Sequence, residues 1–122
     1  MHRILIVDDS RLTRSLLKTQ LMGAGFEIAG EAEDGRQAVE LYAKLLPDLV
    51  TMDVTMPQMD GITASQAIWE TFPEARILLV TSLDHRELRL KVQDKGNAGL
   101  LSKPFTAEQL KEEVTRLLRQ SR

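Results

Sequence analysis

An open, doubly wound α/β sheet is the fold class that this sequence predicts, and two observations support it. Short apolar runs alternate with amphipathic helical patterns over the whole chain of 122 residues. Strict alternation of this kind is typical of parallel strands joined by right-handed helical crossovers. The β-α unit recurs five times, which is too few for an eight-stranded barrel. We therefore expect a five-stranded parallel sheet in the order 2-1-3-4-5, with helices on both faces.

Three of the expected strands are continuous or nearly continuous apolar runs, as in central strands that are covered on both faces. They occupy residues 4–7, 49–52 and 77–80. Residues 26–30 alternate more between apolar and polar side chains, and residues 99–102 form a short run. We expect these two segments at the edges of the sheet.

Apolar residues at helical spacing predict the helices between the strands, because each set forms one stripe. The stripes are Leu12, Leu16, Leu17 and Leu21; Ala38, Leu41, Tyr42 and Leu45; Ala64, Ile68 and Phe72; and Leu110, Val114, Leu117 and Leu118. Ser10 and Asp34 are expected to be N-caps, and Thr106 with Gln109 to form a capping box. The four prolines all fall between the expected elements.

Composition narrows the class of protein. Sixteen Lys and Arg against eighteen Asp and Glu leave a net charge of −2, which argues against direct nucleic-acid binding. The chain has no cysteine, so thiol chemistry and cysteine-based zinc sites are excluded. It has neither an apolar run long enough to span a bilayer nor a signal peptide, so we expect no membrane insertion and a cytoplasmic location. Residues 1–122 are expected to form a single domain with no effector domain attached.

Charged and hydroxyl side chains follow four of the five expected strands. Asp8 and Asp9 end the first strand, Asp53 ends the third, Thr81 the fourth, and Lys103 follows the fifth. Because ligands bind at the carboxyl ends of the strands in open α/β sheets, these side chains should share one site.

Three carboxylates in one site repel one another, and one lysine cannot neutralise them. A hard divalent cation can, and Mg²⁺ favours carboxylates together with water and phosphate oxygens. Asp53 would then be a nucleophile facing a phosphoryl donor, and its attack on phosphorus gives an acyl phosphate. Mg²⁺, Lys103 and the Thr81 hydroxyl would stabilise the charge on the phosphoryl oxygens.

Three segments together resemble a response-regulator receiver domain over the whole chain. They are Ile-Leu-Ile-Val-Asp-Asp-Ser at 4–10, Met-Asp-Val-Thr-Met-Pro-Gln-Met-Asp-Gly at 52–61, and Lys-Pro-Phe at 103–105. The resemblance implies a flavodoxin-like fold and a two-component signalling protein rather than an enzyme. Its only catalysis would be its own phosphorylation and slow dephosphorylation. We expect a regulator of the chemotaxis type.

The resemblance also assigns roles at the strand ends. Asp53 matches the phosphoacceptor. Asp9, Asp53 and the backbone carbonyl of Thr55 match the direct ligands of the Mg²⁺ site, and Asp8 matches the acidic neighbour that holds metal-bound water. Mn²⁺ is expected to substitute for Mg²⁺.

The remaining assignments concern the phosphoryl-binding side of the site. Thr81 matches the switch hydroxyl, the backbone near Ser82 is expected to bond the phosphoryl group, and Lys103 matches its lysine partner. The Lys103–Pro104 peptide bond is expected to be cis. Leu100 stands where the family usually has Tyr or Phe, which argues against an output gated by an aromatic ring.

The expected partners are a sensor histidine kinase and, at the output face, a target protein or a second receiver. This face consists of the fourth helix, the last strand and the last helix, and the charged segment 85–91 belongs to it. The protein is expected to be a monomer or a weak dimer that depends on phosphorylation. Leu83 and Thr55 occupy positions that often tune the access of water to the phosphoryl group in this family.

Other functions remain open at this point. Within the family, the chain could be a phosphorelay shuttle or a receiver scaffold that is never phosphorylated. A small phosphatase of the haloacid-dehalogenase type would need a second Asp where Thr55 stands. A flavin-binding module shares the strand order, but Asp8 and Asp9 would repel its phosphate.

Trp69 gives a first test, because it is the only tryptophan and lies on the expected third helix, away from the acidic strand ends. We expect Mg²⁺ to quench its fluorescence only weakly in a titration. A large quench that disappears in Asp9→Ala would contradict this placement.

Overall fold

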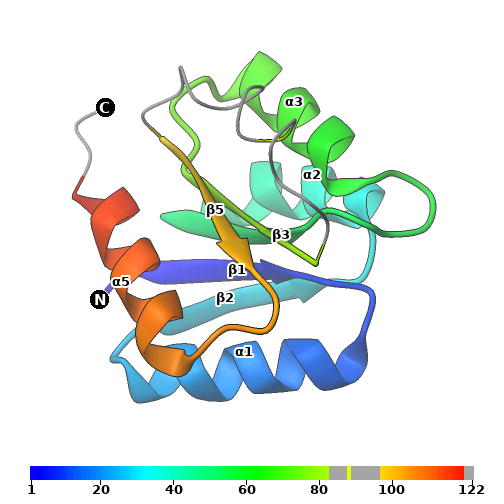
Figure 1. Ribbon diagram of the computed structural model, residues 1–122. Helices are drawn as coiled ribbons and strands as arrows, with labels where there is room; N and C mark the ends of the chain where they lie inside the picture. The colour runs from blue at the N-terminus through cyan, green and yellow to red at the C-terminus, as the bar shows by residue number, and fades with distance from the viewer. Residues whose placement is uncertain (83–87, 89–96, 120–122) are drawn as a thin grey trace.

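A parallel sheet forms the centre of the protein (Figure 1). The computed structural model describes residues 1–82, 88 and 97–119. The strands are β1 (Arg3–Val7), β2 (Glu27–Ala32), β3 (Leu49–Asp53), β4 (Ile77–Thr81) and β5 (Ala98–Ser102). All four neighbouring pairs are parallel, and the order is β2-β1-β3-β4-β5, which confirms the predicted flavodoxin-like topology.

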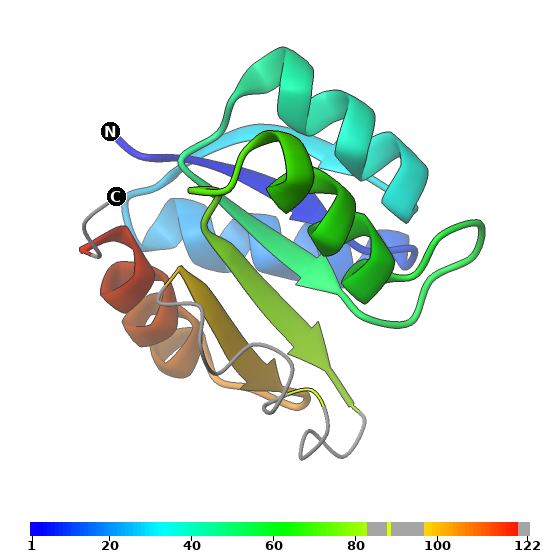
Figure 2. The ribbon, with the colours of Figure 1, turned by 90° about the horizontal axis from the view of Figure 1, so that it is seen from above.

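Helices cover both faces of this sheet. The described helices are α1 (Arg11–Gly23), α2 (Gly35–Leu45), α3 (Gly61–Thr71) and α5 (Ala107–Leu118). Helices α1 and α5 contact each other on one face, and α2 and α3 contact each other on the opposite face (Figure 2). None of these helices is long and apolar enough to cross a membrane. The expected fourth helix, Leu83 and the segment 85–91 apart from Leu88 lie outside the described residues.

The core has two layers because successive side chains of a strand point to opposite faces. On β1, Leu5 and Val7 belong to the cluster under α2 and α3, whereas Ile4 and Ile6 belong to the cluster under α1 and α5. β1, β3 and β4 are buried along nearly their whole length, and the two edge strands are only partly buried. The central strands are therefore held from both sides, which fixes where each of them ends.

The expected stripe of the first helix is half wrong. Leu17 and Leu21 are buried, but Leu12 and Leu16 are 82% and 51% exposed. Successive helical residues are about 100° apart around the axis. Leu12 therefore lies on the opposite side of α1 from Leu21, so one sheet cannot cover both pairs.

Side-chain caps begin the helices where the sequence predicts them. Ser10 and Asp34 accept from the backbone N–H groups of Thr13 and Gln37, and Thr106 forms its capping box with Gln109. Asp60, which we did not predict as a cap, accepts from the backbone N–H of Thr63 at 2.8 Å.

Thr106→Ala should lower the free energy of unfolding by about 1 kcal/mol, because it leaves the Gln109 backbone N–H without its capping oxygen. Urea unfolding checks this. Thr115→Ala on the same helix is the control and should leave stability unchanged or slightly higher, since alanine has the better helix propensity. Equal losses in the two variants would contradict a specific capping role.

Candidate functional site

The acidic side chains meet because β1 and β3 are neighbours that end at the same edge of the sheet. Val7 is in register with Met52, so Asp8 directly follows β1 beside the place where Asp53 ends β3. The backbone N–H of Asp8 donates to the carbonyl of Ala32 on β2, which continues the sheet by one further bond. The positions of these two carboxyl groups are therefore set by the most buried part of the fold.

Asp8, Asp9 and Asp53 form one cluster. One carboxylate oxygen from each residue lies within 4.8 Å of those from the other two. The side chains of Asp8 and Asp53 are only 1% and 8% exposed, whereas Asp9 is exposed. The backbone N–H of Ser10 donates to Oδ1 of Asp8 at 2.9 Å. The cluster thus has two buried carboxylates and one at the rim.

Among the described residues, Lys103 is the side-chain cation that forms ion pairs with this cluster. Its Nζ lies 3.3 Å from Oδ2 of Asp8 and 3.4 Å from Oδ1 of Asp53. Its backbone N–H donates to the carbonyl of Thr81 at 2.8 Å, which ties it to the end of β4. The peptide bond that follows, Lys103–Pro104, is cis, in agreement with the expectation.

The environment shifts the protonation of Asp53. The pKa of its carboxyl group is raised from 3.8 to about 6, chiefly by burial, because a charged carboxylate is less stable out of water. The negative charge of Asp8 adds to the rise, and the Lys103 ammonium opposes it. One ammonium is therefore not enough to offset burial and the neighbouring charges.

The donor set fits a hard divalent cation. Three carboxylates and one ammonium leave an excess of negative charge at the site. Two of the three carboxylates are buried, so water cannot compensate this charge fully. Mg²⁺ binds through one or two carboxylates together with waters and phosphate oxygens, and such a cation would supply the missing positive charge. The exposed Asp9 leaves the cluster open to solvent on one side.

Thr81, Ser82 and Thr55 lie at the same edge of the sheet, whereas Leu100 does not. Thr81 is buried at the end of β4, and Ser82 is exposed immediately after it. The side chain of Thr55 is exposed in the loop that follows β3. Leu100 lies in the middle of β5, the neighbour of β4, and is half-buried against the core cluster under α2 and α3. Trp69 lies at the far end of α3, where its indole N–H donates to the carbonyl of Ala75 ahead of β4.

A close backbone contact beside Asp53 was not predicted from the sequence. The backbone N–H of Gly61 donates to the carbonyl of Val54 at 2.8 Å, which closes the loop between β3 and α3. A Cβ atom at position 61 would overlap the carbonyl oxygen of Asp53. Glycine after an N-capping Asp could have suggested a tight helix start, but not which backbone it touches.

Comparison with known proteins agrees with this geometry. Residues 4–115 match the family described as response regulator receiver domain. The chain belongs to the response regulator receiver family. This membership leaves the phosphatase and flavin-binding alternatives without support, and it makes the protein a signalling domain of the CheY-like kind.

Several similar relatives are named as chemotaxis proteins. The receiver is 43% identical to the chemotaxis protein CheY of Bacillus subtilis, over 96% of this chain and 98% of the relative. It is 39% identical to CheY of Thermotoga maritima, over 94% and 96%. A solved complex of CheX, CheY, BeF₃ and Mg²⁺ from Borrelia burgdorferi contains a chain that aligns with a TM-score of 0.91 and 34% identity, covering 98% of this receiver and 90% of that chain.

Asp53→Asn should raise the free energy of unfolding by about 1–3 kcal/mol at neutral pH in metal-free buffer. The pKa is 3.8 for an ordinary aspartate and about 6 for Asp53 in the folded protein, so the folded protein holds this proton more tightly than the unfolded chain does. The stability of the wild type therefore falls as the pH rises from about 3.8 to about 6. The variant has no carboxyl group to ionise at this position, so it does not lose stability in this pH range. Urea unfolding at pH 4.5 and 7.5 with EDTA checks this. A variant that is less stable than the wild type at pH 7.5 would contradict it.

Proposed function

We propose that this receiver accepts a phosphoryl group on Asp53 from the phosphohistidine of a sensor kinase, in a reaction that depends on Mg²⁺. One observation carries the proposal. The Asp53 carboxylate ends a buried central strand with a second carboxylate within 4.8 Å and the Lys103 ammonium 3.4 Å away. Burial and these neighbours make the ionised form of Asp53 costly, and a further positive charge would stabilise it. The ionised carboxylate is the form that attacks phosphorus.

Each residue of the site has a distinct part in this proposal. Asp8, Asp9, Asp53 and the backbone carbonyl of Thr55 are the ligands for the cation. Mg²⁺, or Mn²⁺ in its place, would supply positive charge to the phosphoryl oxygens and to the carboxylates. The fit of three clustered carboxylates to a divalent ion supports this assignment.

The chemical step is a transfer between two nucleophiles. A carboxylate oxygen of Asp53 forms a bond to phosphorus while the bond from phosphorus to the imidazole nitrogen of the donor breaks, and the imidazole leaves with that electron pair. Lys103 stabilises the charge on the phosphoryl oxygens, and Thr81 donates its hydroxyl hydrogen to one of them. The backbone near Ser82 completes the phosphoryl contacts. The position of Lys103 between Asp8 and Asp53 supports its role.

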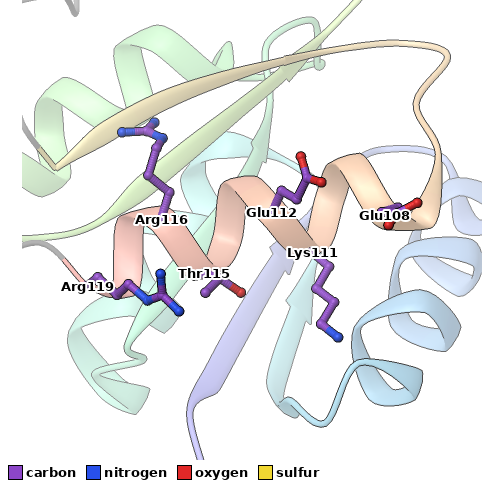
Figure 3. A pocket seen from close by; sticks show the side chains of 6 residues that line it. All are labelled: Glu108, Lys111, Glu112, Thr115, Arg116 and Arg119. Carbon is purple, nitrogen blue, oxygen red and sulfur yellow. The ribbon is translucent and has the colours of Figure 1, made fainter.

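The phosphorylated form is proposed to act through the face formed by the expected fourth helix, β5 and α5, of which the structure describes β5 and α5. Two hollows support this surface. One of about 560 Å³ lies along α5 and is lined by charged side chains of both signs (Figure 3). The other, of about 280 Å³, lies between β5 and α5, and Leu100 and Pro104 help to line it. Glu112 lines both hollows.

An output partner at this face is proposed to be a target protein or a second receiver. The Borrelia burgdorferi CheY is in a complex with CheX, which supports regulation through protein contacts. Leu100 has no ring that could turn between two positions, so we propose that the shift at this face follows the loop after Thr81 rather than an aromatic rotamer.

Intact mass spectrometry after incubation with Mg²⁺ and acetyl phosphate tests the phosphoacceptor. The wild type should gain the mass of one phosphoryl group, because Asp53 is the proposed phosphoacceptor and its carboxylate lies 3.4 Å from the Lys103 ammonium. Asp53→Asn should gain none, and omitting Mg²⁺ should abolish the gain in the wild type. A gain that persists in Asp53→Asn would place the phosphoryl group elsewhere, and no gain in the folded wild type would favour a scaffold function.

A further inference from the structure

The first residue of α2 lies against the loop that follows Asp53. Gly35 is buried, and its backbone N–H donates to the carbonyl of Met59 at 3.2 Å. A Cβ atom at position 35 would overlap that carbonyl oxygen and would lie 2.9 Å from Cβ of Met59. These atoms belong to the backbone or are bonded to it, so no side-chain rotation can relieve the overlap. The contact requires a residue without a side chain.

The requirement is one of space and not of backbone conformation. Gly25 shows the contrast, because its φ is +93° and nothing lies within 4 Å of its Cβ position. Gly35 begins a helix and has no positive φ, so an alanine there could adopt the same backbone conformation, but its Cβ would overlap the loop. Local turn chemistry therefore does not explain Gly35, whereas its approach to Met59 does.

The loop from Val54 to Asp60 is held at two places. At its base, the N–H of Val54 donates to the carbonyl of Val80, and the carbonyl of Val54 accepts from the N–H of Gly61. Near its other end, the carbonyl of Met59 accepts a hydrogen bond from the backbone N–H of Gly35. Thr55, whose carbonyl is a proposed ligand of the cation, lies between these two anchors.

Helix α2 is the less yielding partner in this contact. Its start is capped by Asp34, which accepts from the backbone N–H of Gln37 at 2.8 Å, and Ala38 and Tyr42 bury its inner side in the core. The loop, in contrast, has exposed residues at Thr55, Pro57 and Gln58. A side chain at position 35 would therefore displace the loop before it displaced the helix.

We propose that Gly35 is a positioning residue for the divalent cation, acting through the loop that carries the Thr55 carbonyl. The proposal rests on the metal site of the proposed function and adds α2 to the parts that set its affinity. The missing side chain lets α2 hold the loop close to the sheet. In Gly35→Ala the three carboxylates are unchanged, but the Thr55 carbonyl moves away from its place and the affinity for the cation falls.

Metal binding without any phosphodonor is the direct test. We would measure Mn²⁺ binding by the paramagnetic resonance signal of the free ion in the wild type, Gly35→Ala and Gly23→Ala. Gly23 is the matched control, because it ends α1 with nothing within 4 Å of its Cβ position. Gly35→Ala should bind Mn²⁺ at least threefold more weakly while remaining folded by circular dichroism, and Gly23→Ala should bind like the wild type. A loss of affinity smaller than threefold in Gly35→Ala would overturn the proposal.

Phosphorylation kinetics separate positioning from general damage. With acetyl phosphate as donor, Gly35→Ala should need more Mg²⁺ for half of its maximal labelling rate, and its rate at saturating Mg²⁺ should approach that of the wild type. A lowered maximal rate with unchanged Mg²⁺ dependence would contradict a role in metal affinity.

A measurement on the wild type covers the case in which Gly35→Ala does not fold. In an amide nuclear magnetic resonance titration with Mg²⁺, the signals of Gly35 and Thr55 should shift with the same midpoint, and the signal of Gly23 should stay in place. A Gly35 signal that stays in place while Thr55 shifts would overturn the proposal.

These outcomes are distinct from those of the proposed function. A wild type that binds Mn²⁺ but gains no phosphoryl group would remove the phosphoacceptor function and leave the role of Gly35 to be decided by metal affinity. A wild type that binds no Mn²⁺ would remove the metal site and the role of Gly35 with it.

Discussion

Unbalanced negative charge at one edge of the sheet is the constraint on which the rest of this receiver depends. Asp8 and Asp53 cannot move apart, because each directly follows or ends a buried central strand and the two strands are hydrogen-bonded neighbours. Each carboxylate loses water through burial and gains a like-charged neighbour. The fold therefore holds these groups in an arrangement that is unfavourable by itself, and a binding partner with positive charge can relieve it.

The surrounding structure is built to tolerate that arrangement. Two apolar clusters cover both faces of the central strands, so the strain at their carboxyl ends is opposed by the most densely buried part of the protein. Loops at the same edge are held mainly by backbone contacts, such as Gly61 to Val54 and Lys103 to Thr81. On the proposed function, such a sheet with backbone-anchored loops would let a change of charge at Asp53 act on the loops without disturbing the core.

Much of this could be predicted from the sequence, because the decisive features are local. Strand ends are visible where an apolar run meets Asp8 or Asp53, and the β-α alternation then brings those ends to one edge. The caps at Ser10, Asp34 and Thr106 follow from a few neighbouring residues. The sequence could not show which way a side chain faces or which distant segments come into contact. Leu12 and Leu16 have the same spacing as Leu17 and Leu21, and only packing shows which pair faces the sheet.

The glycine contacts show the same limit more strongly. Gly61 lies against the backbone of Asp53 at the end of β3, and Gly35 lies against the backbone of Met59 in the loop that follows. The two glycines begin α3 and α2, and nothing near Gly35 in the sequence points to Met59. A requirement that arises between distant segments leaves no local pattern. Sequence reasoning therefore finds the groups that carry charge more readily than the backbone contacts that set their positions.

Lys103 links the charge imbalance to the proposed output face. Its ammonium contacts Asp8 and Asp53, its backbone N–H is bonded to Thr81, and Pro104 beside it lines the hollow between β5 and α5. On the proposed function, phosphorylation converts the carboxylate partner of Lys103 into a group with more negative charge and more acceptor oxygens. On that proposal the ammonium would change its contacts, and its backbone would carry the change to the ends of β4 and β5. A leucine at position 100 does not interrupt this connection, because the path runs through the main chain from Thr81 to Pro104 and requires no aromatic ring.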